Sequence, residues 1–220
     1  MRILLLYFSF LLLIMGACTG YQGKGDKLAD TVQTTVRGEP LRVDTIIDAA
    51  YSFDEAIQGS RAPRHIIGEL ELFDVIYHST DGKIHRGQLM SHKKIAPELR
   101  TLFGFMLQEG FVVEKAIPMA RYDWNDSLSM ADNNSYSFCY RNIGYSKHAS
   151  GMAIDINPLF NPLRWKKANK PNQPLGAVSD TTLNGTLHPN HPVVIAFKKR
   201  GFRWGHTFTK YYDDHHFEKK

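Results

Sequence analysis

The sequence predicts a single α+β domain in which a small antiparallel sheet has helices packed on one side. An alternating apolar pattern over residues 69–77 is followed by an Asp-Gly pair and a second strand-like run over 83–89, which favours a β-hairpin. Apolar residues then recur every three or four positions between Ser91 and Gly110, which predicts an α-helix capped by Ser91. The alternating pattern of a strand and the three-to-four-residue spacing of a helix together indicate a fold that contains both.

Shorter elements are expected to complete the domain. In chain order they are a strand over 112–122, a strand over 152–157, a helix over 193–199 ended by Gly201, and a last strand over 211–218. The proline- and asparagine-rich span 157–192 is long for a connection without regular structure, so we expect a functional surface loop there.

Length and charge restrict the class of protein. The 220 residues are 43% hydrophobic, which suits one compact domain, expected over residues 41–220 and expected to be a monomer. The formal net charge is +5, but the basic residues are scattered along the sequence and form no dense basic stripe. We therefore expect no nucleic-acid partner.

The N-terminus has the layout of a secretory signal peptide over residues 1–18, with one arginine, an apolar run and small residues before Cys18. Residues 15–18, Met-Gly-Ala-Cys, resemble a bacterial lipobox, so Cys18 is expected to carry lipid; an ordinary signal peptide and a retained anchor are the alternatives. The polar residues 19–40 are expected to be a flexible tether. The protein is thus predicted to be exported to a bacterial cell envelope and membrane-anchored, facing the periplasm or the cell surface.

The stretch SKHASGMAID, residues 146–155, carries the first candidate ligands, His148 and Asp155. A catalytic zinc ion takes three protein ligands and leaves one position to water, so two residues do not close such a site. Taken alone, the stretch favours a polar hairpin.

The stretch YDDHHFE, residues 212–218, offers the missing ligand as His215 or His216, beside Asp213 and Asp214. Neighbouring residues of a strand point to opposite faces, so the two histidines cannot both face one metal. An acid and a ligand three positions apart would need a turn or bulge between them.

These two stretches resemble the SxHxxGxAxD and DxxHFE motifs of zinc peptidases of the D-alanyl-D-alanine carboxypeptidase type, the M15 group, whose members cut peptidoglycan stem peptides. The resemblance implies the M15 or hedgehog-type peptidase fold, one zinc ion held by His148, Asp155 and His216, and Asp213 as the catalytic carboxylate. It also implies that Arg141 holds substrate or transition-state charge; a surface ion pair is the alternative. Relatives carry WGGxW where this chain has Trp204-Gly205-His206, so the cleft wall is expected to differ.

The implied reaction is hydrolysis of a peptide bond by zinc-activated water, with Asp213 as general base. Three activities remain open: D,D-carboxypeptidase, D,D-dipeptidase and L-Ala-D-Glu-type endopeptidase. A zinc-stabilised module that binds cell-wall peptides without cutting them is the alternative function, and an exported peptide unrelated to the wall is an alternative substrate. Glu218 is expected to accept the second ring N–H of a ligand histidine.

Overall fold

The computed structural model describes residues 35–36, 39–40, 45–141, 146–167 and 169–220. The chain divides into two units, Met1–Arg42 and Val43–Lys220. In the first unit, β1 (Thr35–Val36) and β2 (Glu39–Pro40) pair antiparallel. The predicted signal peptide and lipobox lie outside the described residues, as does most of the predicted tether.

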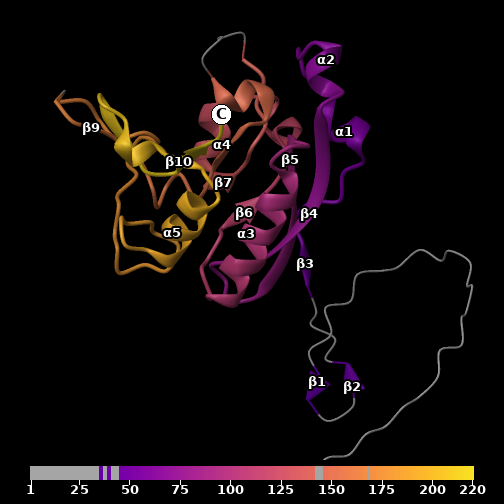
Figure 1. The fold of residues 1–220 in the computed structure, drawn as a ribbon, viewed down its shortest axis with the longest axis horizontal. Helices are drawn as coiled ribbons and strands as arrows, with labels where there is room; N and C mark the ends of the chain where they lie inside the picture. Colours follow the sequence, from indigo (N-terminus) through magenta and orange to yellow (C-terminus); the bar gives the residue numbers. More distant parts are fainter. Residues whose placement is uncertain (1–34, 37–38, 41–44, 142–145, 168) are drawn as a thin grey trace, which may run out of the picture. The chain divides into compact units, whose positions relative to one another are not determined.

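A long antiparallel hairpin in the second unit confirms the predicted one (Figure 1). It consists of β4 (Leu70–His78) and β5 (Ile84–His92), paired along their whole length from Leu70↔His92 to His78↔Ile84. The Asp-Gly pair lies in the connecting turn, where Gly82 has a φ of +78° that glycine adopts without a steric cost. β3 (Ile46–Ile47) adds a parallel strand to β5.

Helix α3 (Ala96–Gln108) packs against this hairpin through the apolar face that its spacing predicts. It begins four residues later than expected, because Ser91 is fully buried inside β5 and does not cap the helix. Pro97 lies in the first turn, where its missing N–H breaks no helical hydrogen bond. Gly110, with a φ of +66°, follows the end of the helix as predicted.

A second sheet carries both chemical motifs. Its order is β10 (Arg203–Trp204), β12 (His216–Glu218) and β8 (Ala153–Asp155), all antiparallel. Helix α5 (Pro192–Lys199) covers it, and the ring of Phe197 stacks on the ring of Phe217 with centroids 4.2 Å apart. The predicted helix over 193–199 is thus confirmed.

One apolar core joins the two sheets. Val75 of β4, Ile154 of β8 and Phe217 of β12 belong to the same buried cluster, together with the inner faces of α3 and α5. The fold is therefore α+β, as predicted, but its strands form several small sheets. The described residues also include two two-stranded sheets, parallel β6 (Lys115–Ala116) with β7 (Asn134–Ser135), and antiparallel β9 (Leu163–Trp165) with β11 (Tyr211–Asp213).

Several predicted elements differ from the structure. The expected strand over 112–122 shrinks to a bridge at Val112 and the two residues of β6, and Pro118 then begins the 3₁₀ turn η1 (Met119–Tyr122). The expected loop over 157–192 contains β9. Three short helices were not predicted, because none spans enough residues to show a period: α1 (Phe53–Ile57), α2 (Arg64–Ile67) and α4 (Asp126–Ala131).

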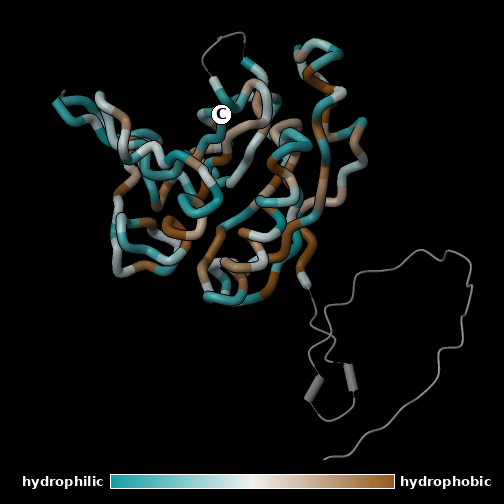
Figure 2. Tube along the Cα trace, in the orientation of Figure 1, coloured by the Kyte–Doolittle hydropathy of each residue, from teal (hydrophilic) through white to brown (hydrophobic). Residues whose placement is uncertain are grey.

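The expected last strand is two strands, β11 and β12, separated by a turn at Asp214 and His215. β11 pairs with β9 and β12 pairs with β8, so the chain passes from one sheet to another at this turn. The β9 end of the second unit is largely hydrophilic (Figure 2). Among the described residues, no helix has the length and apolar character needed to cross a membrane.

Candidate metal centre

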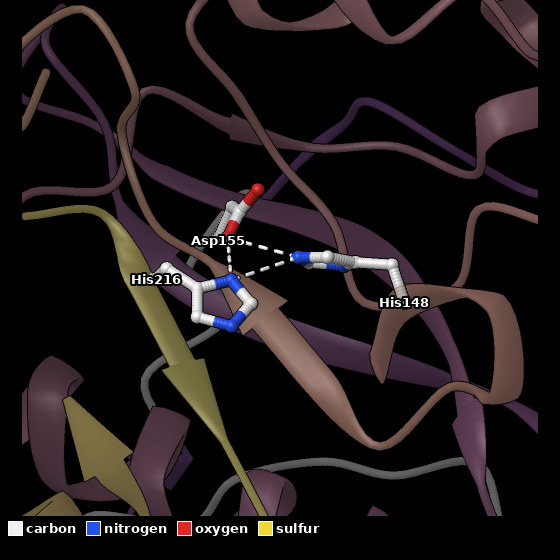
Figure 3. Close-up of side chains that lie close together, drawn as sticks. All are labelled: His148, Asp155 and His216. Carbon is white, nitrogen blue, oxygen red and sulfur yellow. Dashed lines mark hydrogen bonds and ion pairs between the residues drawn. The ribbon is translucent and has the colours of Figure 1, made fainter. Parts of the chain in front are cut away.

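Three elements bring His148, Asp155 and His216 together (Figure 3). His148 lies in the 3₁₀ turn η2 (Lys147–Ser150), Asp155 ends β8, and His216 begins β12. Because β8 and β12 are antiparallel and His216 is paired with Asp155, the two side chains are direct cross-strand neighbours. The two motifs thus meet on adjacent antiparallel strands.

The three potential ligand atoms form a tight triangle. His148 Nε2 lies 3.1 Å from Asp155 Oδ1 and 3.0 Å from His216 Nδ1, and the latter lies 2.9 Å from Asp155 Oδ1. All three side chains are buried. Ligands placed about 2.1 Å from a tetrahedral zinc ion would lie about 3.4 Å apart, so only small shifts separate this triangle from a zinc site.

The outer ring nitrogens determine which way the histidines face. His148 Nδ1 lies 2.7 Å from the backbone oxygen of Ser137, and His216 Nε2 lies 3.3 Å from Glu218 Oε2, so both outer nitrogens donate. In neutral rings the two inner nitrogens are then both acceptors, facing each other at 3.0 Å beside a carboxylate. Only a cation between them, either a proton or a metal ion, makes this arrangement favourable. The predicted role of Glu218 fits this geometry.

The pKa values of the cluster follow from its charges. Burial alone would raise the pKa of Asp155, but the neighbouring His148 and His215 outweigh it and hold that pKa well below its usual range. Burial would lower the pKa of His216, but hydrogen bonds to Asp155 and Glu218 raise it to about 10. The site therefore keeps a negative carboxylate in the interior and attracts positive charge.

Two glycines let the backbone approach the site closely. Gly151 follows η2 with a φ of +69°, and a Cβ added there would lie 2.6 Å from the backbone nitrogen of His92. A Cβ added at Gly205 would lie 2.7 Å from Asp213 Cβ and 3.2 Å from His216 Cβ. Side chains at either position would displace the elements that carry the ligands and the predicted base.

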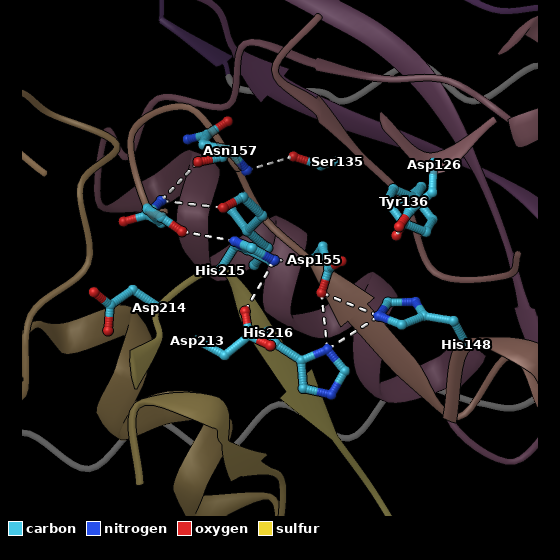
Figure 4. Close-up of polar contacts among 12 residues, drawn as sticks. Asp126, Ser135, Tyr136, His148, Asp155, Asn157, Asp213, Asp214, His215 and His216 are labelled. Atoms are coloured by element: carbon cyan, nitrogen blue, oxygen red, sulfur yellow. Dashed lines mark hydrogen bonds and ion pairs between the residues drawn. The ribbon is translucent and has the colours of Figure 1, made fainter. Parts of the chain in front are cut away.

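Asp213 and His215 form an ion pair beside the triangle, in which His215 is buried and Asp213 is half-buried (Figure 4). His215 Nε2 lies 2.9 Å from Asp213 Oδ1, and His215 Nδ1 donates to the backbone oxygen of Asn161 at 2.7 Å. Burial would lower the pKa of His215, but the carboxylates of Asp213 and Asp155 raise it to about 9. His215 Nδ1 thus donates to a backbone oxygen and Nε2 is engaged in the ion pair with Asp213, which leaves His216 as the histidine that faces His148.

The side chain of Tyr136 connects Arg141 to the triangle, because it contacts both Arg141 and His148. Arg141 Nη2 donates to Asp126 Oδ1 and to Tyr136 Oη, both at 3.1 Å, and the ring of Tyr136 lies 5.0 Å from the ring of His148. The guanidinium is thus held by a hydrogen-bonded pair, Tyr136 and Asp126. Its Nε is buried and has no partner among the described residues, so Arg141 keeps donors to spare.

The turn between β11 and β12 is fixed by Asp214, Arg164 and His206, none of which the sequence predicted to hold it. Asp214 is buried and accepts from Arg164 Nε at 2.9 Å and Nη2 at 2.7 Å. His206 Nδ1 lies 2.7 Å from the other oxygen of Asp214, and its ring stacks on Trp204 with centroids 4.4 Å apart. His206, which stands where relatives carry the second glycine of WGGxW, thus supports the turn through its contact with Asp214. Arg164 could have been found only by placing β9 beside β11.

Comparison with known proteins bears on the segment that holds this centre. The family model described as D-alanyl-D-alanine carboxypeptidase, of the M15 peptidases, matches residues 141–219. The match confirms the M15 resemblance. These residues include all three members of the triangle, Asp213 and Arg141. No curated protein and no solved structure matches the chain.

Proposed function

We propose that this protein is an M15 peptidase that hydrolyses peptide bonds in peptidoglycan stem peptides with one zinc ion held by His148, Asp155 and His216. The observation that carries the proposal is the buried triangle of ligand atoms whose outer N–H groups are already engaged, within the matched segment. Two histidines, one carboxylate and an open fourth position are the usual protein contribution to a catalytic zinc site.

The chain's own residues supply the proton transfers and the substrate contacts. Bound zinc lowers the pKa of water and polarises a carbonyl group. Asp213, oriented by His215 at 2.9 Å, takes a proton from the attacking water and returns it to the leaving amine. Arg141, held by Asp126 and Tyr136, offers its remaining N–H groups to a peptide carboxylate or to the developing oxyanion.

Digestion of defined muropeptides, with mass spectrometry of the fragments, tests the function and identifies the bond. D,D-carboxypeptidase, D,D-dipeptidase and L-Ala-D-Glu-type endopeptidase activities give different masses. Asp213→Ala should keep one equivalent of zinc and lose at least about 100-fold in rate, because the general base is gone. Asp180→Ala, which changes an exposed carboxylate outside the site, serves as the control. Full activity in Asp213→Ala would refute the assignment, and sacculus binding without any fragment would favour the binding module.

We also propose that Cys18 is lipidated and anchors the enzyme in a bacterial cell envelope. The support is the lipobox-like Met-Gly-Ala-Cys at the end of a short apolar run. Labelling with radioactive palmitate should mark the wild-type chain and spare Cys18→Ser. Equal labelling of both would exclude lipid on this cysteine.

A further inference from the structure

Basic residues are unevenly distributed along this chain. Residues 157–212 contain nine of its 27 lysines and arginines but only one of its 22 aspartates and glutamates, Asp180. The rest of the chain therefore has three more acidic than basic residues, although the whole carries +5. The nine are Arg164, Lys166, Lys167, Lys170, Lys198, Lys199, Arg200, Arg203 and Lys210.

The fold gathers part of this charge on the β9–β11 ribbon and the adjoining residues, beside the predicted base. β9 pairs with β11 residue by residue, from Trp165↔Tyr211 to Leu163↔Asp213. Lys166, Lys167 and Lys170 follow β9, and all three are exposed. Asp213 thus lies at one end of the β9–β11 ribbon, and the three lysines lie beyond its other end.

Aromatic rings connect the cations to the metal centre in one continuous series. The ring of Phe208 lies 5.7 Å from that of His216 and 5.8 Å from that of Tyr211, and Tyr211 lies 5.6 Å from Trp165. The ammonium group of Lys170 lies 4.6 Å from the centre of the Trp165 ring. All three non-histidine rings are half-buried, so each keeps an accessible portion.

Two more cations lie near rings. The guanidinium of Arg203 lies 4.5 Å from the centre of the Phe208 ring, and its Nη1 lies 3.6 Å from Glu218 Oε1. The ammonium of Lys166 lies 4.3 Å from the centre of the Tyr212 ring, which points to the face of the ribbon opposite Tyr211. Cations placed over ring faces lose part of their side-chain freedom before any ligand arrives, which lowers the entropic cost of binding. Trp165 Nε1 also has no hydrogen-bond partner among the described residues.

We propose that this surface, which includes both faces of the ribbon and is defined by Trp165, Lys166, Lys167, Lys170, Arg203, Phe208, Tyr211 and Tyr212, holds the anionic glycan–peptide polymer whose stem peptides enter the metal centre. The inference rests on the proposed function for the identity of the polymer. Lysine and arginine complement the free carboxylates of the stem peptides, and the rings offer apolar faces to the chain between them. The surface begins at a metal ligand, so a polymer bound along it lies next to Asp213.

Sedimentation with purified insoluble sacculi tests the proposal. The full chain with Cys18→Ser and Asp213→Ala is used, so that neither lipid nor cleavage contributes. Lys166→Gln, Lys167→Gln and Lys170→Gln together should weaken sacculus binding about fivefold or more, and added salt should weaken the binding of the parent protein. In a chain with Asp213 intact, the same triple variant should cleave a short soluble stem peptide at the parent rate.

The matched control is Lys83→Gln, Lys94→Gln and Arg121→Gln, three exposed basic residues outside the surface. It removes the same charge and should leave sacculus binding unchanged. Equal loss in both triple variants, or undiminished binding in the first, would overturn the proposal. So would tighter binding to phosphatidylglycerol vesicles than to sacculi, because the surface would then serve a membrane.

The same experiments can refute the proposed function and this inference independently of each other. A protein that binds sacculi through the three lysines but releases no fragment from any muropeptide would refute the peptidase and support the surface. Cleavage of soluble stem peptides, together with sacculus binding that does not depend on the three lysines, would support the peptidase and refute the surface.

Discussion

His148 Nε2 and His216 Nδ1 face each other at 3.0 Å, and each ring donates its outer N–H to a fixed oxygen. Two such nitrogens repel unless positive charge lies between them. The outer partners, Ser137 and Glu218, therefore do as much to define a cation site as the three inner atoms do.

The adjacent histidines His215 and His216 should respond differently to substitution. His216→Ala should weaken zinc binding more than about 100-fold, because it removes a ligand. His215→Gln should keep zinc and lower the rate about 10-fold to 100-fold, because Asp213 loses the ring that orients it at 2.9 Å. Zinc content by atomic emission and rates on one muropeptide distinguish the two effects. Loss of zinc in His215→Gln would reverse the assignment.

Glu218 should control metal affinity without touching the metal. Glu218→Ala should weaken zinc binding about 10-fold to 100-fold, because His216 Nε2 loses its acceptor at 3.3 Å. Glu218→Gln, which keeps a carbonyl acceptor, should recover part of this affinity. Glu98→Ala is the control, since it removes a carboxylate that pairs with Lys219, next to Glu218. Competition with a chromogenic chelator measures all three, and equal affinities would contradict the role.

Gly151 should tolerate alanine less well than Gly110 does. Both have φ near +70°, where alanine costs about 1 kcal/mol. A Cβ at Gly151 would also lie 2.6 Å from His92 N, whereas a Cβ at Gly110 meets nothing within 4 Å. We expect Gly151→Ala to lower the free energy of unfolding by about 2 kcal/mol more than Gly110→Ala does. Urea unfolding measures the difference, and equal losses would show that the close approach is unimportant.

His85 should make stability depend on pH at a place remote in sequence from both motifs. Its Nδ1 lies 2.9 Å from Asp48 Oδ1 and its Nε2 lies 3.1 Å from Asp81 Oδ1. Burial would lower the pKa of His85, but the two carboxylates outweigh it and raise that pKa. A raised pKa in the folded state stabilises below the unfolded pKa of about 6.5, and this stabilisation is lost as the pH rises through the folded value.

The His85 effect is measured by urea unfolding from pH 6 to pH 8. The wild type should lose more stability over this range than His85→Gln, in which the titrating group is gone. His65→Gln, which changes an exposed ring on α2, should follow the wild type. Parallel curves for the wild type and His85→Gln would rule out the contribution.

The grouping of His148, Asp155 and His216 could be predicted from the sequence because two short motifs resemble the M15 pattern. Asp155 and His216 sit on paired strands, so two motifs were sufficient to bring them together. The support around them could not be predicted in this way. Arg164 reaches Asp214 from β9, fifty residues away in sequence, and that strand is only three residues long. Its pairing depends on tertiary context that no local period reveals.

The long elements of the fold were predicted better than the short ones. The hairpin β4–β5 and helix α3 each show a clear apolar period, and both are confirmed. The start of α3 was wrong because Ser91 satisfies a capping pattern but is buried in a strand, where packing overrides local preference. The scattered basic residues gave no sign of a surface until the pairing of β9 with β11 brought some of them to one ribbon.

The turn at Asp214 and His215 separates two mechanical parts of the molecule. Asp213 belongs to the sheet of β9 and β11, and His216 belongs to the sheet of β8, β10 and β12. The proposed base is therefore anchored in one sheet and the potential ligand His216 in another, although only two residues separate them in the chain.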